Sequence, residues 1–149
     1  MIIKIDMENA FDRVNHEFLY KVLNKFGFQS SFISWINACI SNPWITPLIN
    51  GRPTPFFQAT RGLRQGFPLS PLLYVIMVET LNRRLEQERI SKNILGLKIM
   101  RGVKRINNSQ FADDTLLLGG ASHVMAQRFK TVLDQYEQAS GGLINKHKS

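Results

Sequence analysis

NSQFADDTLLLGG, residues 108–120, places two adjacent acids, Asp113 and Asp114, between two runs of strand-forming residues. This pattern predicts a strand, a turn at the acids and a second strand. Adjacent carboxylates repel each other, and a divalent cation between them would remove the repulsion because carboxylate oxygens suit Mg²⁺. A solvated turn explains the same two acids equally well, so the segment by itself leaves both interpretations open.

A third carboxylate, Asp6, ends the first apolar segment of the chain, in which Ile2, Ile3 and Ile5 surround Lys4. Such a pattern is typical of a short strand. Beyond it, helix caps, apolar spacing and glycines predict helices near residues 15–26, 30–42, 71–85 and 122–140. A short glycine-bearing pair is expected at residues 96–106. This order of strands and helices indicates an α+β fold.

A hairpin is expected between the second and third helices. WITPLI, residues 44–49, and FFQATRG, residues 56–62, flank the dipeptide Asn50-Gly51, and Asn-Gly is the strongest short hairpin signal. Proline cannot donate a ladder hydrogen bond, so prolines favour exposed or edge strands. Four lie in this region: Pro43, Pro47, Pro53 and Pro55.

The segment RGLRQGFPLSP, residues 61–71, joins this hairpin to the third helix. Its glycines and prolines fix an unusual backbone path, and Arg61, Arg64 and Gln65 supply hydrogen-bond donors. Donors and bare backbone before a helix suit a phosphate, a sugar or a base. A structured connection without a ligand is the alternative.

Composition limits the function classes. The 149 residues suffice for one domain, and 19 basic against 11 acidic residues give a net charge of +8. Such an excess favours a polyanionic partner, with nucleic acid first, although a merely basic surface would also explain it. The single cysteine, Cys39, excludes an internal disulfide, and its apolar neighbours predict a buried thiol. The three histidines, His16, His123 and His147, are expected on the surface.

The sequence gives no sign of export or membrane insertion. Acidic residues follow too soon after Met1 for a signal peptide, and the longest apolar run, residues 72–78, is far shorter than the roughly 20 residues that span a bilayer. We therefore expect an intracellular protein, nuclear or cytoplasmic, with no membrane contact.

Four segments in this order resemble the successive palm motifs of reverse transcriptases: KIDMENAFDRV (4–14), RGLRQGFPLSP (61–71), FADDTLLL (111–118) and SGGLINKHKS (140–149). The last segment is similar to that of non-LTR, LINE-like retrotransposons of the plant type. The resemblance implies that residues 1–149 are a partial palm domain, an antiparallel sheet backed by helices with a ferredoxin-like core. It also implies that the fingers and thumb of the parent polyprotein are missing.

The resemblance implies a two-metal site. Asp6 and Asp113 match the aspartates that bind two Mg²⁺ ions, for which Mn²⁺ can substitute, and Asp114 matches a supporting acid. Phe11 stands where the family places an aromatic steric gate against the C2′ position of the incoming sugar. A core aromatic is the alternative interpretation of Phe11.

The resemblance also implies contacts with an incoming nucleotide. They come from the backbone N–H groups of Asn9 and Ala10, from the loop residues Arg64, Gln65 and Gly66, and from Lys148. Lys148 matches a position that can protonate pyrophosphate, but a solvated tail lysine explains it as well. The family commonly reads RQGDPLSP, and here Phe67 replaces the aspartate, so one hydrogen-bond acceptor is lost.

The implied activity is RNA-directed DNA synthesis, with an RNA template, a DNA primer and deoxynucleoside triphosphates as partners. We expect the isolated fragment to be inactive. Two alternatives belong to other classes: a non-catalytic relic of a retroelement, and a basic RNA-binding module that retains the palm fold.

Overall fold

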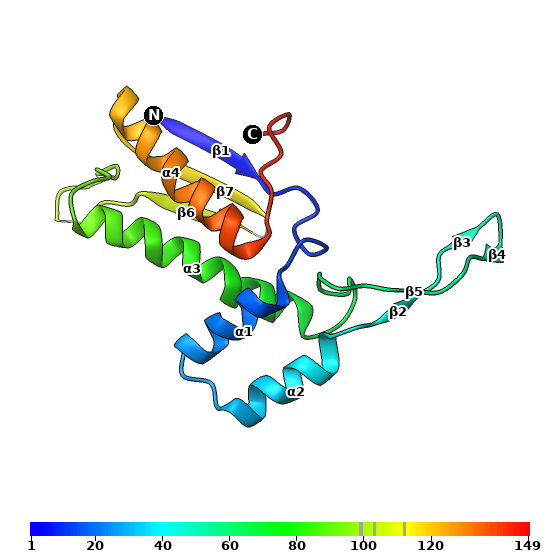
Figure 1. Ribbon diagram of the computed structural model, residues 1–149. Helices are drawn as coiled ribbons and strands as arrows, with labels where there is room; N and C mark the ends of the chain where they lie inside the picture. The colour runs from blue at the N-terminus through cyan, green and yellow to red at the C-terminus, as the bar shows by residue number, and fades with distance from the viewer. Residues whose placement is uncertain (99, 103, 112) are drawn as a thin grey trace.

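A three-stranded antiparallel sheet forms one end of the molecule, with strands in the order β1-β7-β6 (Figure 1). The computed structural model describes residues 1–98, 100–102, 104–111 and 113–149. Asp6 pairs with Asp114 at one end of the β1–β7 ladder, and Ile2 pairs with Leu118 at the other. The strands are β1 (Ile2–Asp6), β6 (Asn108–Phe111) and β7 (Asp114–Leu118). The predicted strand–turn–strand is confirmed, although Ala112 lies outside the described residues.

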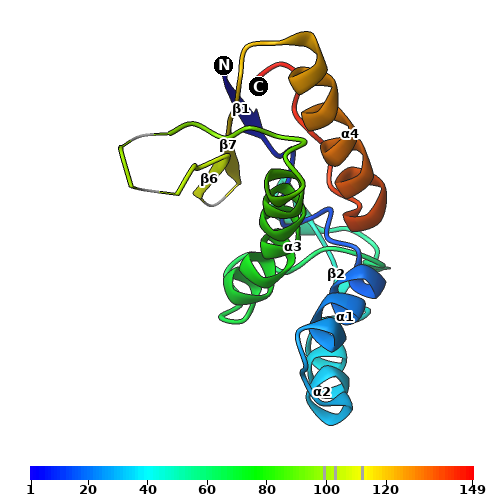
Figure 2. The same ribbon diagram turned by 90° about the vertical axis from the view of Figure 1, so that its left-hand side faces the viewer.

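Two long helices, α3 (Ser70–Ile90) and α4 (His123–Ser140), cover one face of the sheet (Figure 2). Ile5 and Leu117 point into the apolar cluster under these helices, and Leu117 is fully buried. The bounds of α4 follow local chemistry, because Ser122 caps its first turn and Gly141 ends it with a φ of 77°. Among the described residues, no helix is both long and apolar enough to cross a membrane.

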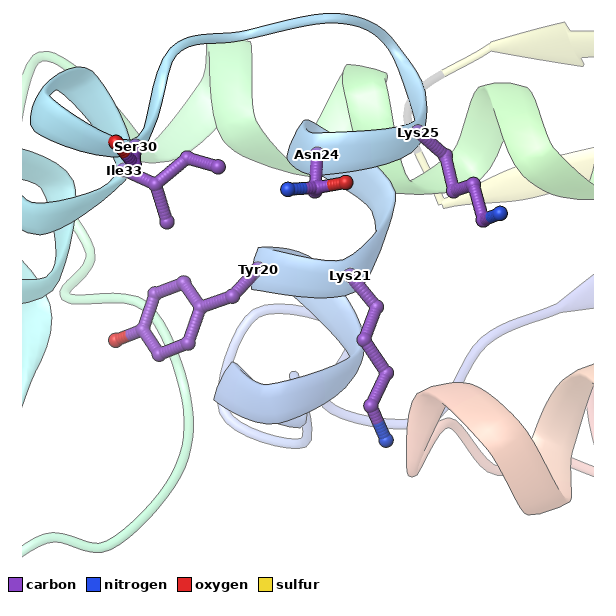
Figure 3. A pocket seen from close by; sticks show the side chains of 6 residues that line it. All are labelled: Tyr20, Lys21, Asn24, Lys25, Ser30 and Ile33. Carbon is purple, nitrogen blue, oxygen red and sulfur yellow. The ribbon is translucent and has the colours of Figure 1, made fainter.

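A second apolar cluster joins α1 (His16–Lys25) and α2 (Ser30–Ile40) to the N-terminal half of α3. Leu19 and Leu23 of α1 are fully buried there against residues of α2 and α3. The Asn15 side chain caps α1 by accepting a hydrogen bond from the Phe18 N–H, as the sequence predicts. A cavity of about 400 Å³ lies between α1 and α2 (Figure 3).

The predicted hairpin is present and projects from the body of the molecule (Figure 1). We call residues 44–58 the hairpin arm. Asn50 and Gly51 have φ angles of 51° and 75°, as a two-residue type I′ turn requires. All the strand residues of the arm are exposed, in β2 (Trp44–Ile45), β3 (Leu48–Ile49), β4 (Arg52–Pro53) and β5 (Phe57–Gln58).

The predicted glycine-bearing pair is reduced to a single bridge. Leu97 and Ile106 bridge where a glycine-bearing pair is expected, and Ile99 and Val103 lie outside the described residues. Beside β1, on the edge opposite β7, Met7 and Ile144 form an isolated bridge. The antiparallel sheet backed by helices is confirmed, and the ferredoxin-like core stays a prediction.

Two side chains differ from the sequence-based expectation. Cys39 is exposed rather than buried, because α2 turns Ile36 and Ile40 toward the core and leaves Cys39 on another face. His16 is not a free surface residue, since its Nε2 lies 2.7 Å from the Gly62 carbonyl oxygen. The apolar residues next to Cys39 in the sequence therefore did not indicate which face of α2 is buried.

Candidate active site

A polar pocket of about 280 Å³ opens at the end of the sheet where β1 stops and β7 begins. It brings together residues from four distant segments of the chain. Its lining is Asp6, Met7, Glu8, Asn9, Ala10, Phe11, Gln65, Asp113, Asn145 and Lys148. Most of the predicted site residues therefore line one pocket, and Arg64, Gly66 and Asp114 are not part of its lining.

Backbone hydrogen bonds on both sides fix the position of Asp6. Its N–H donates to Ser149 Oγ at 3.1 Å, and its carbonyl accepts from the Asn145 N–H at 2.9 Å. On the other side, the Met7 N–H donates to the Asp113 carbonyl at 3.3 Å. The end of β1 is thus held between the C-terminal segment and the turn that carries Asp113, so both aspartates face the same pocket.

Asp114 belongs to a different environment. Lys4 Nζ lies 3.0 Å from Asp114 Oδ1 in a partly exposed ion pair. The ammonium group is within ion-pair distance but outside hydrogen-bond geometry, so Oδ1 has no hydrogen-bond donor among the described residues. Lys4 lies two residues before Asp6 on β1, which places both side chains on one face of the sheet. The third predicted acid therefore lies beside the pocket, paired with a lysine.

Phe11 connects the pocket to the helical core. Its ring stacks on Tyr74 of α3, with centroids 4.8 Å apart and an interplanar angle of 24°. Phe11 is half-buried and lines the pocket, whereas Tyr74 is buried. Burial, together with the negative charge of Asp113, raises the pKa of Tyr74 to about 12. Phe11 is thus a packed aromatic that also borders the acidic pocket, so both interpretations of its position are compatible with the geometry.

The turn after β1 presents backbone donors to the pocket. Asn9 has a φ of 46°, and its carbonyl accepts from the Asp12 and Arg13 N–H groups at 2.9 and 3.2 Å. Within the described part of the chain, the N–H groups of Asn9 and Ala10 donate no hydrogen bond. A tight turn with free N–H groups at a pocket is suited to an anionic ligand.

The loop of residues 61–71 is pinned against the segment that follows this turn. The Gly62 N–H donates to the Val14 carbonyl at 2.9 Å, and the Leu63 N–H donates to the Phe11 carbonyl at 2.8 Å. Gly62 has a φ of 91°, and a Cβ there would lie 2.7 Å from the Asp12 carbonyl oxygen. Only glycine allows this close approach, which delivers Gln65 to the pocket.

Arg64 folds away from the pocket. Its Nη2 donates to the Cys39 carbonyl at 3.1 Å, and its guanidinium lies 4.8 Å from the centroid of the Phe67 ring. Phe67 therefore forms a cation–π contact with Arg64. The aspartate that reverse transcriptases commonly have at this position would instead accept hydrogen bonds. Gly66 lies at the turn of this loop with a φ of 81°.

The sequence interpretation missed four residues of this region, among them Met7, which lines the pocket. Asn145 and Glu8 line the pocket, and Ser149 accepts the hydrogen bond from Asp6. Asn145 and Ser149 belong to the motif SGGLINKHKS, which could have suggested a structural role beside β1, whereas nothing distinguished Glu8 from a surface acid. Lys148 lines the pocket and is exposed. This position fits both a lysine that protonates pyrophosphate and a solvated tail lysine.

The donor set of the pocket is chemically suited to a hard cation. Its side chains offer the carboxylates Asp6, Asp113 and Glu8 and the amides Asn9, Asn145 and Gln65, without a histidine or cysteine. Oxygen donors of this kind suit Mg²⁺ or Mn²⁺. Among the described residues, no group of three or more His, Cys, Asp or Glu side chains is close enough to hold one metal ion. The pair Asp6 and Asp113 is therefore the part of the predicted metal set that faces the pocket.

The comparisons with known proteins agree on one family. A family model described as "Reverse transcriptase (RNA-dependent DNA polymerase)" matches residues 1–149. The "Transposon TX1 uncharacterized 149 kDa protein" of Xenopus laevis is 31% identical over 99% of this chain. A "Retrovirus-related Pol polyprotein from type-1 retrotransposable element R2" of Popillia japonica is 30% identical over 78% of this chain. The aligned parts span only 11% and 18% of these two relatives.

The fold has a counterpart among solved structures. A structure of telomerase from Candida albicans in complex with a fragment of telomeric RNA superposes with a TM-score of 0.70. The match covers 99% of this chain and 27% of that one, at 16% sequence identity. At this identity the likeness establishes the fold, and it agrees with the α+β plan expected from the sequence.

Proposed function

Because the chain belongs to the reverse transcriptase (RNA-dependent DNA polymerase) family, we propose that it is part of the palm of an RNA-directed DNA polymerase. The parent element would be a plant-type, LINE-like retrotransposon, related to those of TX1 and R2. The observation that carries the proposal is the pocket in which Asp6 and Asp113 lie beside Phe11 and Gln65. The proposed partners are an RNA template, a DNA primer and deoxynucleoside triphosphates.

The proposed reaction is nucleotidyl transfer. The primer 3′-hydroxyl oxygen forms a bond to the α-phosphorus, and the bond from that phosphorus to the oxygen bridging to the β-phosphate breaks. Pyrophosphate leaves with that oxygen, and the hydroxyl proton passes to solvent water. Asp6 and Asp113 would hold Mg²⁺ or Mn²⁺, which when bound neutralises charge on the attacking and leaving oxygens. Positioning and charge neutralisation are sufficient for this chemistry, and the pocket offers no serine or cysteine nucleophile in its lining.

The other residues of the pocket would bind and select the nucleotide. The free N–H groups of Asn9 and Ala10 would donate to the triphosphate, and Gln65 would contact the incoming nucleotide. The Phe11 ring, held by its stack on Tyr74, would exclude a ribose 2′-hydroxyl. Lys148 would donate a proton to the leaving pyrophosphate.

Primer extension on an RNA template tests the proposal. The full-length protein that contains this chain should extend a labelled primer with deoxynucleotides. Asp6→Asn and Asp113→Asn should each abolish extension, and Asp114→Asn should reduce it less, because Asp114 is paired with Lys4 outside the pocket. The 149 residues alone, which cover a small share of their relatives, are expected to give no extension.

Sugar selection provides an independent readout. Phe11→Val should admit ribonucleotides more readily while deoxynucleotide extension continues. Unchanged sugar discrimination would remove Phe11 from the gate role and leave it a core aromatic. Extension that survives Asp113→Asn would contradict the proposed centre, and a folded full-length protein without any extension would favour the catalytically dead relic.

A further inference from the structure

The hairpin arm exposes large apolar side chains that the rest of the chain leaves uncovered. Trp44, Leu48 and Phe56 are 68%, 71% and 67% exposed, and Phe57 is 50% exposed. The arm buries little of itself, because its strands pair in two short two-residue ladders. Exposed apolar side chains gathered on one projecting element mark a contact surface.

Charge indicates the kind of partner. Residues 18–78, which include the whole arm, contain no aspartate or glutamate. The same stretch carries five basic residues: Lys21, Lys25, Arg52, Arg61 and Arg64. The acidic residues that reduce the net charge therefore all lie elsewhere in the sequence, and this part of the chain is complementary to an anion.

The edges of the arm disfavour a partner strand. Pro47, Pro53 and Pro55 have no N–H group to donate to an added strand. Three exposed or half-exposed aromatic rings, Trp44, Phe56 and Phe57, are instead suited to stacking, since every nucleobase presents a flat π-face. Arginine and aromatic side chains in a segment without acidic residues are the combination that binds single-stranded nucleic acid.

The base of the arm adjoins the loop that delivers Gln65 to the candidate active site. A cavity of about 260 Å³ lies there, lined by Ile45 and Ala59 of the hairpin region and by Arg61 and Arg64 of the loop, with Asp12 as its one acidic side chain. A strand that follows the arm toward the body would therefore pass two arginines before it reaches the pocket with Asp6.

We propose that the hairpin arm binds single-stranded nucleic acid, with bases stacked on Trp44, Phe56 and Phe57 and phosphates near Arg52 and Arg61. This proposal rests on the proposed function only for the identity of the strand, which would be the template approaching the pocket. The binding itself requires neither a metal nor catalysis.

The two tryptophans of the chain allow a matched test. Trp35 on α2 and Trp44 on the arm are both 68% exposed, and the sequence has no third tryptophan. Trp35→Phe leaves Trp44 as the single reporter, and Trp44→Phe leaves Trp35. The 149-residue chain is titrated with a 20-nucleotide oligo(U) at several salt concentrations. We expect quenching when Trp44 is the reporter, weakening with salt, and no quenching when Trp35 is the reporter.

Affinity measurements separate stacking from general charge. Trp44→Ala should weaken oligonucleotide binding about tenfold, as expected for loss of one stacked base, while Trp35→Ala should leave it unchanged. Arg52→Gln should weaken binding more than Lys21→Gln, which removes the same charge at the α1–α2 cavity, where Figure 3 shows Lys21 extending from α1 away from Tyr20. Equal losses in the arm and control variants would overturn the proposal.

Two further outcomes are decisive. Concentration-dependent burial of Trp44 without oligonucleotide, accompanied by dimer sedimentation, would assign the arm to a second copy of the chain and overturn the proposal. Asp113→Asn should leave the Trp44 quenching intact. Trp44 quenching in the 149-residue chain, combined with no primer extension by the folded full-length wild-type protein, would support the arm while contradicting the polymerase function. Extension by the full-length protein without Trp44 quenching would overturn the arm alone.

Discussion

The three-stranded sheet and the hairpin arm are both antiparallel, but they use their side chains differently. In the sheet, Ile5, Thr115 and Leu117 are buried under the helices while Lys4 and Leu116 face outward. In the arm, every strand residue is exposed, including Leu48 and Phe57. The sheet therefore stabilises the fold and fixes the acids at its end, whereas the arm contributes little to stability and leaves its side chains available for an external contact.

Matched leucines measure this difference directly. Leu117→Ala should lower the free energy of unfolding by about 2–5 kcal/mol, because it creates a cavity in a fully buried site. Leu48→Ala, at a site 71% exposed, should change it by no more than about 0.5 kcal/mol. Urea denaturation of both variants gives the two values. Similar losses in both would mean that the arm is part of the cooperative core.

Matched glycines extend the test to the backbone. Gly51 in the arm and Gly62 in the pocket loop both have positive φ angles, 75° and 91°. Gly51→Ala meets no atom within 4 Å and should cost only backbone strain, about 1–2 kcal/mol. Gly62→Ala should cost more, since its Cβ would lie 2.7 Å from the Asp12 carbonyl oxygen. Thermal and urea unfolding of the pair decide this, and a Gly51→Ala loss equal to that of Gly62→Ala would contradict the close approach.

Removal of the ion pair between Lys4 and Asp114, at the end of the sheet, should have a smaller effect, on the affinity for Mn²⁺. Lys4→Met removes the cation beside Asp114 and should raise the affinity of the chain for Mn²⁺ about two- to fivefold, since an exposed ion pair contributes at most about 1 kcal/mol. Arg83→Met, which breaks the exposed Arg83–Glu79 pair on α3, is the control and should leave the affinity unchanged. Electron paramagnetic resonance of free Mn²⁺ measures both. A Lys4→Met affinity equal to that of the control would show that the Lys4 charge does not oppose Mn²⁺ binding in the pocket.

The smallest effect concerns Tyr74. Its pKa in the folded chain, about 12, exceeds the ordinary value of 10 because of burial first and the Asp113 charge second. The stability that this shift contributes is therefore complete below pH 10 and is lost as pH rises through 12. Asp113→Asn should lower the pKa of Tyr74 but leave it above 10, as followed by phenolate absorbance. Tyr74→Phe identifies the Tyr74 component of the titration. An unchanged Tyr74 pKa in Asp113→Asn would mean that the two groups lie too far apart to interact.

Local signals were sufficient to predict most of the fold. Asn15 and Ser122 begin helices and Gly141 ends one, because each satisfies or terminates backbone hydrogen bonds within a few residues of itself. Asn50-Gly51 sets the hairpin for the same reason. The bridge between Met7 and Ile144 was not predictable, since these two residues, far apart in the sequence, meet through tertiary packing.

The candidate site was predictable only where position along a motif determines position in space. Asp6 ends β1 and Phe11 lies five residues later, so the motif fixes both relative to the pocket. The Lys4–Asp114 pair and the Arg64 contact with the Cys39 carbonyl depend on strand register and on helix packing. Neither of these is encoded within a single segment, and both move predicted site residues out of the pocket.

Titration of the 149-residue chain with Mn²⁺, followed by electron paramagnetic resonance, tests most directly whether Asp6 and Asp113 form one cation site. The variants are Asp6→Asn, Asp113→Asn and, as a matched control one residue away, Asp114→Asn. We predict that each of the first two abolishes the tightest site, because both carboxylates line the same pocket, while Asp114→Asn retains it. Loss of the site in Asp114→Asn alone, or its persistence in both Asp6→Asn and Asp113→Asn, would contradict this assignment.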